Sequence, residues 1–449
     1  MHISLRATLG GLGVAALMAA CSAGGGGNVF TSSSSGGNVG GNGQGGNGAG
    51  AGSNTGAGDV GSGISLTTSG SGSTGSGNTC NHAPNVDGDG DGWTGDEGDC
   101  NDCDPNVNPG AIDVLATEDG GTTMVDVDCN GVFDPPEPCD TGLAVDSMNP
   151  LDAAKAVELC RVASQNPADK KQKTWGVVHA AWVLPDGSDP TQNASVNIAN
   201  YHLGHGMLSG LGPNVNVQGG QSMLGLSSGT ARVPNTPGYQ AVSGFSKGYT
   251  SGQPQGFPKE SPLCNSGSTT GQANDGAAVE ITIRAPTNAT GFTFDFNFFS
   301  YEWPSYVCTQ FNDFFVAQLT PIPAGQTDGN ISFDSQGNPV SVNNAFVEAC
   351  GCTAGPPCTA GGKSFPCSLG NTGLVGTGFG KDTAGVDHGS TGWLVTKAPV
   401  KGGETITIRW TVYDAGDGIL DSTTLIDNWK WIANGGTVVV GTDPIKTPQ

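Results

Sequence analysis

Cationic side chains are scarce in this sequence, and one long stretch has none. The chain has 17 Lys and Arg residues against 40 Asp and Glu residues in a length of 449. No Lys or Arg occurs between Arg6 and Lys155, and the segment from Cys80 to Asp140 carries 16 carboxylates. This balance argues against a nucleic-acid partner, because binding to a phosphate backbone requires clustered positive charge.

Long apolar runs are also missing. The segment from Ala7 to Leu17 is apolar but too short to cross a membrane as a stable helix. It follows Arg6 and ends in Met18-Ala19-Ala20-Cys21, which resembles a bacterial lipoprotein signal. The resemblance implies a signal peptide over 1–21, a lipid on Cys21 that anchors the protein in a membrane, and a location in the cell envelope, at the outer membrane or cell surface. A plain secretory signal with an incidental Cys is the alternative.

Residues 22–79 have almost no large apolar side chains, and they consist mostly of Gly, Ser, Asn and Thr. Such a segment buries too little surface to offset the entropy of ordering it, so we expect a flexible linker. Twelve Cys residues follow, between Cys80 and Cys367, and an even number suits disulfides in an oxidising compartment. Local pairing, with zinc as the cytosolic alternative, is expected among Cys350, Cys352, Cys358 and Cys367; Cys264 and Cys308 complete the even set.

The stretch NVDGDGDGWTGDEGDCNDCD (85–104) concentrates the acidic charge. Neighbouring carboxylates raise each other's pKa unless a cation compensates, which leaves disorder or bound metal. Asp87, Asp89, Asp91 and Gly92 match positions 1, 3, 5 and 6 of an EF-hand loop. Position 12 is Gly98 and no amphipathic helix precedes the loop, so the pattern indicates a calcium loop of another architecture, closer to a thrombospondin type-3 repeat.

The continuation GDCNDCDPNVNPGAIDV (98–114), followed by DVDCNG (126–131), resembles the metal-binding motif of myxobacterial and MopE-type surface proteins. The resemblance implies hard-cation ligands at Asp87, Asp89, Asp91, Asp99, Asp102, Asp104, Asp126 and Asp128. Oxygen-only ligands suit Ca²⁺ better than Cu or Zn. A solvated acidic linker and another metal remain alternatives. Disulfides among Cys80, Cys100, Cys103, Cys129 and Cys139 would stabilise this small, loop-rich module, placed at 80–141.

Residues 142–449 predict a large antiparallel β-sandwich preceded by one helix, over Pro150–Ser164. Residues alternate between apolar and polar over Val279–Ile283, Phe292–Phe298 and Ile406–Val412. Such period-2 runs between Gly, Pro and Asn turns are typical of antiparallel strands with one buried face. The predicted fold class is therefore mainly β.

Three local sequences in this region resemble the choice-of-anchor L domain, over most of 215–435. They are Gly225–Gly229, FDFNFFSYEWPSYVCTQFNDFF (294–315) and NISFDSQGNPVSVNNAF (330–346). The resemblance implies an extracellular, β-rich surface protein that is not an enzyme. It fits a role in adhesion or in contact with surface or matrix partners, surface glycans and matrix proteins among them.

A second acidic set follows the last predicted strand. The stretch YDAGDGILDSTTLIDNWKW (413–431) places several carboxylates beside Gly416 and Gly418, where they predict a second calcium site or ordinary turn chemistry. The candidate ligands are Asp414, Asp417, Asp421 and Asp427, with Glu302 and Asp313 joining them.

Two motifs suggest enzymes but lack the required context. Gly225-Leu-Ser-Ser-Gly229 matches G-x-S-x-G, yet the residues after it have no helical period. His202-x-x-His205 lacks the Glu and the helix of a zinc protease. Tyr301, Trp303, Tyr306, Trp429 and Trp431 are candidates either for stacking on sugars or for core packing. The sequence predicts a non-catalytic surface protein, with a carbohydrate-binding module or a secreted hydrolase as alternatives.

Overall fold

The computed structural model describes residues 82–118, 121–133, 138–261, 264, 271–334, 337–343, 346–433 and 435–445. The predicted signal peptide with Cys21, the predicted linker at 22–79 and Cys80 lie outside these residues. Within the described ranges, none of the helices has the length and apolar character needed to span a membrane.

The fold is mainly β and antiparallel, which confirms the predicted class. A six-stranded sheet has the order β10-β9-β16-β7-β3, with β6 also paired to β7. An eight-stranded sheet has the order β11-β14-β8-β17-β5-β4, with β15 paired to both β8 and β18. The six-stranded sheet contains β3 (Gly176–Val183), β6 (Thr250–Ser251), β7 (Ala273–Arg284), β9 (Phe314–Thr320), β10 (Val340–Ser341) and β16 (Thr405–Ala415). The eight-stranded sheet contains β4 (His205–Leu208), β5 (Met223–Ser227), β8 (Ala289–Ser300), β11 (Ala349–Cys350), β14 (Gly389–Ser390), β15 (Leu394–Pro399), β17 (Ser422–Ala433) and β18 (Gly441–Pro444).

The remaining elements are short. Two hairpins are formed by β1 (Val114–Glu118) with β2 (Gly121–Val125), and by β12 (Cys358–Ala360) with β13 (Lys363–Phe365). The helices are α1 (Pro150–Lys155) and α2 (Ile198–Leu203), with 3-10 turns η1 (Gly95–Glu97), η2 (Lys170–Gln172), η3 (Pro190–Gln192) and η4 (Thr372–Leu374).

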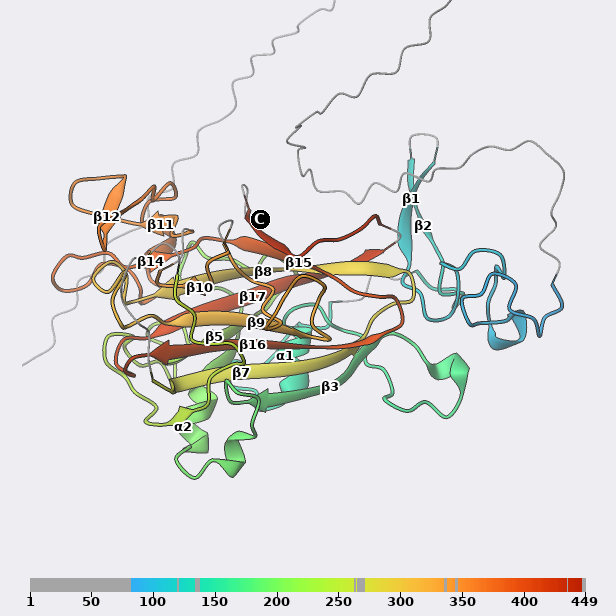
Figure 1. The fold of residues 1–449 in the computed structure, drawn as a ribbon, viewed down its shortest axis with the longest axis horizontal. Helices are drawn as coiled ribbons and strands as arrows, with labels where there is room; N and C mark the ends of the chain where they lie inside the picture. Colours follow the sequence, from blue (N-terminus) through green and yellow to red (C-terminus); the bar gives the residue numbers. More distant parts are fainter. Residues whose placement is uncertain are drawn as a thin grey trace, which may run out of the picture. The chain divides into compact units, whose positions relative to one another are not determined.

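The two large sheets lie face to face and enclose one main core (Figure 1). Trp410 of β16 is fully buried, and its ring lies 5.4 Å from that of Phe294 on β8 and 6.1 Å from that of Trp429 on β17. The predicted alternation placed the rings of Trp410 and Phe294 on the inner face, because successive side chains of a strand point to opposite faces. The three predicted strand runs lie within β7, β8 and β16 and are confirmed.

One detail of the strand prediction is wrong, because β8 is buried on both faces. Asp295 and Asn297 point away from the phenylalanines but are only 5 and 4 % exposed. The Asn428 amide donates to Asp295 at 2.7 Å, and the Ser390 hydroxyl donates to Asn297 at 2.5 Å. A second apolar cluster, which includes Phe299, Phe379 and Trp393, covers this outer face. The alternation of residues predicted that the inner face of β8 is buried. It could not predict burial of the outer face, because residues from loops cover that face.

The predicted helix over Pro150–Ser164 is also too long. Asn149 caps α1 through its side-chain oxygen, but the helix ends at Lys155. Glu158 has a φ of 64°, a left-handed conformation that a continuing helix cannot contain. Further along the chain, Val162 forms a parallel bridge to Val177 of β3. The apolar residues after α1 are therefore buried because the chain turns back toward the sheets, and not because they lie on one face of a longer helix.

Five disulfides join described cysteines. The pairs are Cys100–Cys129, Cys139–Cys160, Cys264–Cys308, Cys350–Cys367 and Cys352–Cys358. Cys103 is also disulfide-bonded. Local pairing within the cluster of four is confirmed, and the bond between Cys264 and Cys308 is one that the sequence left open. The expectation that Cys139 pairs within the acidic module is wrong, because it bonds to Cys160 beyond α1 and so links the module to the sandwich.

Candidate metal centre

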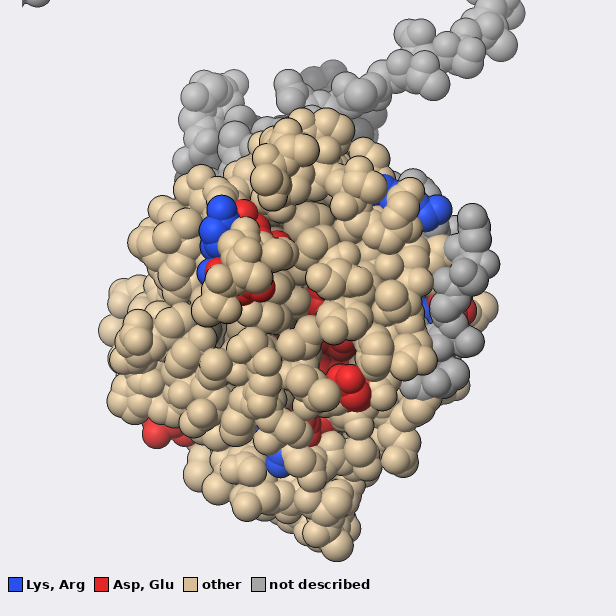
Figure 2. All heavy atoms as spheres, turned by 90° about the vertical axis from the view of Figure 1, so that its left-hand side faces the viewer, with Lys and Arg blue, Asp and Glu red and all other residues tan. Residues whose placement is uncertain are grey.

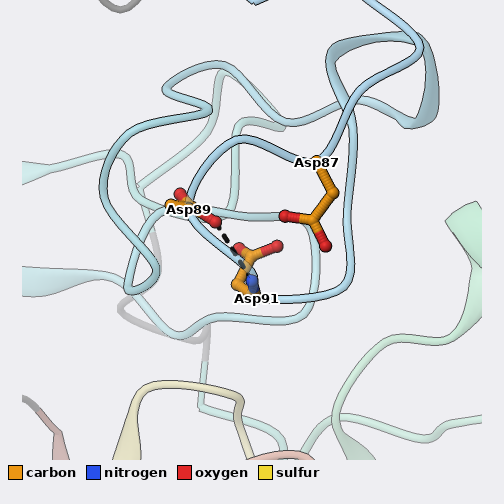
Figure 3. A group of neighbouring side chains, drawn as sticks. All are labelled: Asp87, Asp89 and Asp91. Atoms are coloured by element: carbon orange, nitrogen blue, oxygen red, sulfur yellow. Dashed lines mark hydrogen bonds between the residues drawn. The ribbon is translucent and has the colours of Figure 1, made fainter.

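The acidic loop 87–93 folds around its own carboxylates. The backbone N–H groups of Gly90 and Gly92 donate to the two oxygens of Asp87, at 2.7 and 2.9 Å. The N–H of Asp91 donates to Asp89 at 3.1 Å, and that of Trp93 to Asp91 at 2.7 Å. These turns suit Gly90 and Gly92, whose φ values of 83° and 94° exclude most other residues. Figure 3 shows the three aspartate side chains around the middle of the loop.

Three groups of carboxylates in this module have ligand atoms within 4.8 Å of one another. They are Asp87 with Asp89 and Asp91, Asp89 with Asp99 and Asp102, and Asp113 with Asp126 and Asp128. Asp89 belongs to two groups, so the first two form one continuous acidic centre. The third group lies at the base of the β1–β2 hairpin, where Asp113 precedes β1 and Asp126 follows β2.

Several of these carboxylates have one oxygen bonded to backbone N–H and a second that is buried without a hydrogen-bond partner among the described residues. The unpartnered oxygens are Asp89 Oδ2, Asp91 Oδ2, Asp99 Oδ2 and Asp126 Oδ1. Burial, with the charge of Asp89 added, raises the pKa of Asp91 to about 6. Burial likewise raises the pKa of Asp99 and of Asp128. The buried, unpartnered oxygens and the neighbouring negative charges are what a hard cation would compensate.

The centre is fixed to the sandwich by the loop between β7 and β8. Thr287 donates through its hydroxyl to the Asn108 side chain at 2.7 Å. The Asn288 side chain accepts from Ile112 N–H at 3.0 Å and donates to its carbonyl at 2.9 Å. Arg161, which follows the α1 turn, lies 3.2 Å from a carboxylate oxygen of Asp128. The third acidic group therefore already has one protein cation, whereas no ion pair to the first two groups occurs among the described residues.

Seven of the eight predicted ligands fall into these groups. Asp104 does not, because its Oδ1 accepts from the backbone N–H and the side-chain amide of Asn106, at 3.1 and 3.0 Å. Asp113 belongs to the third group but was missing from the predicted set. Its oxygen accepts from Val127 N–H at 2.8 Å. Its place after Pro109-Gly110-Ala111 in the motif was the only sequence signal available.

The predicted second acidic set is divided by the fold. Glu302, Asp313, Asp414 and Asp421 are all under 4 % exposed and lie where β8 and β16 end and β17 begins. Burial is the main cause that raises the pKa of Asp313 to about 7 and that of Asp421 to about 9. It also raises the pKa of Glu302 and of Asp414, helped by the charge of Asp313. Figure 2 looks onto this end of the molecule and shows a few acidic side chains near the middle of a largely uncharged face.

A protein cation and polar groups partly satisfy this interior set. Asp313 accepts from the Ser422 hydroxyl at 2.7 Å. Lys247 is 2 % exposed; burial lowers its pKa to about 8, and the charges of Asp275, Asp421 and Asp414 oppose that shift. Both oxygens of Asp414 and of Asp421 nevertheless have no hydrogen-bond partner among the described residues. Asp417 adds its charge to this set from a half-buried position.

Asp427, which was predicted with the second set, lies in a different cluster. Its Oδ2 accepts from the backbone N–H groups of Gln218 and Gly219, at 2.5 and 3.3 Å. Burial, followed by the charge of Asp427, raises the pKa of Glu158 to about 9. Asp140 completes the cluster, and a Cβ at Gly220 would collide with its carboxylate and with Glu158. Sequence distance hid this grouping, which joins residues near positions 140, 158, 220 and 427.

The two enzyme-like motifs serve structural roles. Ser227 of the G-x-S-x-G match is fully buried on β5, where its hydroxyl donates to the Ser422 carbonyl at 3.1 Å. β5 pairs antiparallel with β4 and β17, and no parallel strand-to-helix turn follows. His202 Nδ1 lies 2.8 Å from His205 Nε2, and the His205 ring stacks on Trp182. Neither histidine lies in a carboxylate or cysteine group of metal-binding size within the described residues.

The tryptophans considered for sugar stacking are core residues. Trp303, Trp429 and Trp431 are 1, 5 and 8 % exposed. Trp429 stacks on Phe292 with the ring centroids 4.1 Å apart. Tyr301 and Tyr306 are half-buried, and Tyr301 stacks on His388. A sugar therefore has no access to the three indole faces.

The fold is a mainly β sandwich of two antiparallel sheets. The choice-of-anchor L domain matches residues 190–429, and the chain belongs to this family. The matched range lies inside the sandwich predicted at 142–449 and extends further toward the N-terminus than the resemblance seen at 215–435. No curated protein and no solved structure matches the chain. The family is not an enzyme family, and membership implies a cell-surface protein.

Proposed function

We propose that this protein is a non-catalytic, lipid-anchored surface protein whose acidic module binds calcium as part of its structure. The observation that carries the proposal is the set of buried, unpartnered carboxylate oxygens shared by the three groups. No Lys or Arg of the module itself balances these charges. Ca²⁺ takes six to eight oxygen ligands with flexible geometry, which suits a centre made of aspartates and loop backbone.

The alternatives explain less of the geometry. In a solvated acidic linker the carboxylates would separate, whereas Asp89, Asp91 and Asp99 keep their oxygens close and partly buried. A thiophilic metal would favour cysteine or histidine ligands, but Cys100, Cys103 and Cys129 are disulfide-bonded. Calcium therefore supplies the positive charge and rigidity that the module lacks, and the sandwich serves adhesion or contact with surface or matrix partners.

Calorimetric titration of the whole purified chain with CaCl₂ tests the calcium proposal. We expect binding at more than one site, reduced in an Asp87→Asn, Asp89→Asn variant because both changes fall in the continuous centre. Asp96→Asn is the matched control, since Asp96 is an exposed carboxylate of the same loop outside all three groups. Absence of calcium binding by the oxidised wild-type chain would overturn the proposal.

The lipid anchor has a separate test. In cells that process lipoproteins, we expect the chain to partition into the detergent phase and a Cys21→Ala variant to partition into the aqueous phase. Mass spectrometry of the N-terminal peptide would show acyl chains on Cys21. Equal aqueous partitioning of both proteins would contradict the anchor and leave the calcium proposal untouched.

A further inference from the structure

A cleft with a volume of about 440 Å³ lies between the acidic module and the sandwich. One wall is the calcium loop at Asp91 to Trp93, and another is the segment around η2 that leads to Trp175. The loops before β8 and before β16 complete it, through Thr287 and the residues 401–404. The ion pair between Lys170 and Glu97, at 2.6 Å, brings η2 against the module (Figure 1 shows both at the same end of the sandwich).

The charge of this cleft is opposite to that of the chain. Four of the 17 cationic residues line it, and only two carboxylates do, so the lining carries a net charge of 4 − 2 = +2 against −23 for the whole sequence. The cations are Lys170, Lys173, Arg284 and Lys401, and the carboxylates are Asp91 and Glu404. In a chain so poor in Lys and Arg, this concentration selects for an anionic ligand.

Two of the four cations have no carboxylate partner among the described residues. Arg284 is only 6 % exposed, and its guanidinium donates to the backbone carbonyls of Thr174 at 2.9 Å and Ser164 at 2.9 Å. Lys173 is exposed and makes no ion pair within the described ranges. Lys401 pairs with Glu404 at 3.3 Å, but both side chains are solvent-exposed, so a ligand can compete for the ammonium group.

Two tryptophans contribute to the walls between these charges. Trp93 and Trp175 are 4 and 9 % exposed. Lys170 lies over the Trp93 ring at 5.3 Å, and Arg161 over the Trp175 ring at 4.8 Å. The indole N–H of Trp175 is a buried donor without an acceptor among the described residues. A lining that combines two tryptophans with polar groups and cations suits a charged small molecule that also carries ring carbons and hydroxyl groups.

We propose that this cleft binds an acidic sugar residue, with the anionic group at Lys173 and Lys401. The volume exceeds what a single inorganic anion fills and accommodates one or two sugar rings. This inference rests on the proposed function in one respect. A surface location would expose the cleft to acidic polysaccharides outside the cell. The inference does not require calcium at the acidic centre, although the centre forms one wall.

Calorimetry on the whole chain in saturating calcium, with a glucuronate-containing disaccharide as the probe, tests the proposal. Three further ligands are compared with it: the neutral disaccharide that has glucose in place of glucuronate, a sulfated disaccharide, and inorganic phosphate. We expect the glucuronate probe to bind, with an affinity that falls as salt rises, and the neutral probe to bind at least tenfold more weakly. Tighter binding of the sulfated probe would also support an acidic sugar and would identify sulfate as the preferred anionic group.

Matched lysine variants locate the site. Lys173→Ala is expected to weaken glucuronate binding about tenfold, the loss typical of one charge-assisted hydrogen bond. Lys171→Ala removes the same charge two residues away, outside the cleft lining, and is expected to leave the affinity unchanged. Equal effects of the two variants, equal binding of the neutral probe, or inorganic phosphate binding as tightly as the sugars would each overturn the proposal.

Calcium titration of the same samples separates this inference from the proposed function. If Lys173→Ala loses the sugar but keeps calcium binding, the cleft proposal stands on its own. If the wild-type chain binds the sugar but not calcium, the calcium proposal fails and the cleft remains. If the wild-type chain binds calcium but none of the acidic sugars, the cleft proposal fails and the calcium proposal remains.

Discussion

The acidic module and the interior of the sandwich both gather carboxylates, but they stabilise them differently. In the module, Asp87, Asp89 and Asp91 accept hydrogen bonds from the backbone of their own loop, within about five residues of sequence. In the sandwich, Asp421 and Glu158 are surrounded by side chains from distant elements, and burial raises the pKa of each to about 9. The proposed cation would therefore compensate the charge of the module, whereas the interior carboxylates can hold protons.

The largest effect should come from the apolar core of the sandwich. Trp410→Ala removes a fully buried ring between the two sheets and is expected to cost about 3–5 kcal/mol of unfolding free energy. Denaturant unfolding with calcium and with chelator should give the same loss. A loss that depends on calcium would break the comparison, because the core would then be coupled to the module.

The disulfide of the module should matter nearly as much. Replacing Cys100 and Cys129 with Ala opens a loop of 29 residues and is expected to cost roughly 3 kcal/mol in the chain-entropy account. Limited proteolysis should cut the module of this variant first, and chelator should speed the cleavage. The Cys352–Cys358 pair, with a sequence separation of only 6, provides the control, with a smaller effect that chelator leaves unchanged.

Calcium itself should stabilise the module by mass action. At a free concentration of about 100 times Kd, one site contributes about 2.7 kcal/mol. Asp89→Asn should reduce this gain more than Asp102→Asn, because Asp89 belongs to two groups and Asp102 to one. Thermal unfolding with and without calcium measures both variants, and equal losses would mean that the two groups do not share an ion.

The smallest expected effect is a change in how stability depends on pH. It tests which interior carboxylate causes that dependence. The pKa of Glu158 rises from an ordinary 4.5 to about 9 in the fold, mainly through burial. The native state then holds a proton that the unfolded chain has lost, so stability is highest below the unfolded pKa and falls as pH rises toward about 9.

Glu158→Gln should remove part of this slope and gain at least about 1 kcal/mol at about pH 9, where the buried wild-type carboxylate begins to ionise in the folded state. Unfolding in chelator at acidic, neutral and alkaline pH measures the difference. An unchanged slope would show that Asp421 or its neighbours, and not Glu158, carry the pH dependence.

The features of both regions that depend on local sequence were predictable, and those that depend on distant contacts were not. The strands β7, β8 and β16 followed from period-2 alternation, and the grouping of Asp87, Asp89 and Asp91 followed from the Asp-x-Asp-x-Asp-Gly spacing, because both signals are local. The length of α1 did not, since the chain leaves the helix to reach β17, where Trp429 N–H donates to the Val157 carbonyl. The partner of Cys139 and the inclusion of Asp113 also depended on contacts that spacing does not reveal.

The sequence by itself determined the mainly antiparallel β class, the absence of balancing cations from the acidic module and the local carboxylate turns. These are consequences of composition and short spacing. Only the tertiary structure decided which carboxylates share an interior, which tryptophans are buried and where the few cations gather. Asp140, Glu158 and Asp427, like Lys173, Arg284 and Lys401, are far apart in the chain, and only the packing of the sheets and their loops brings each set together.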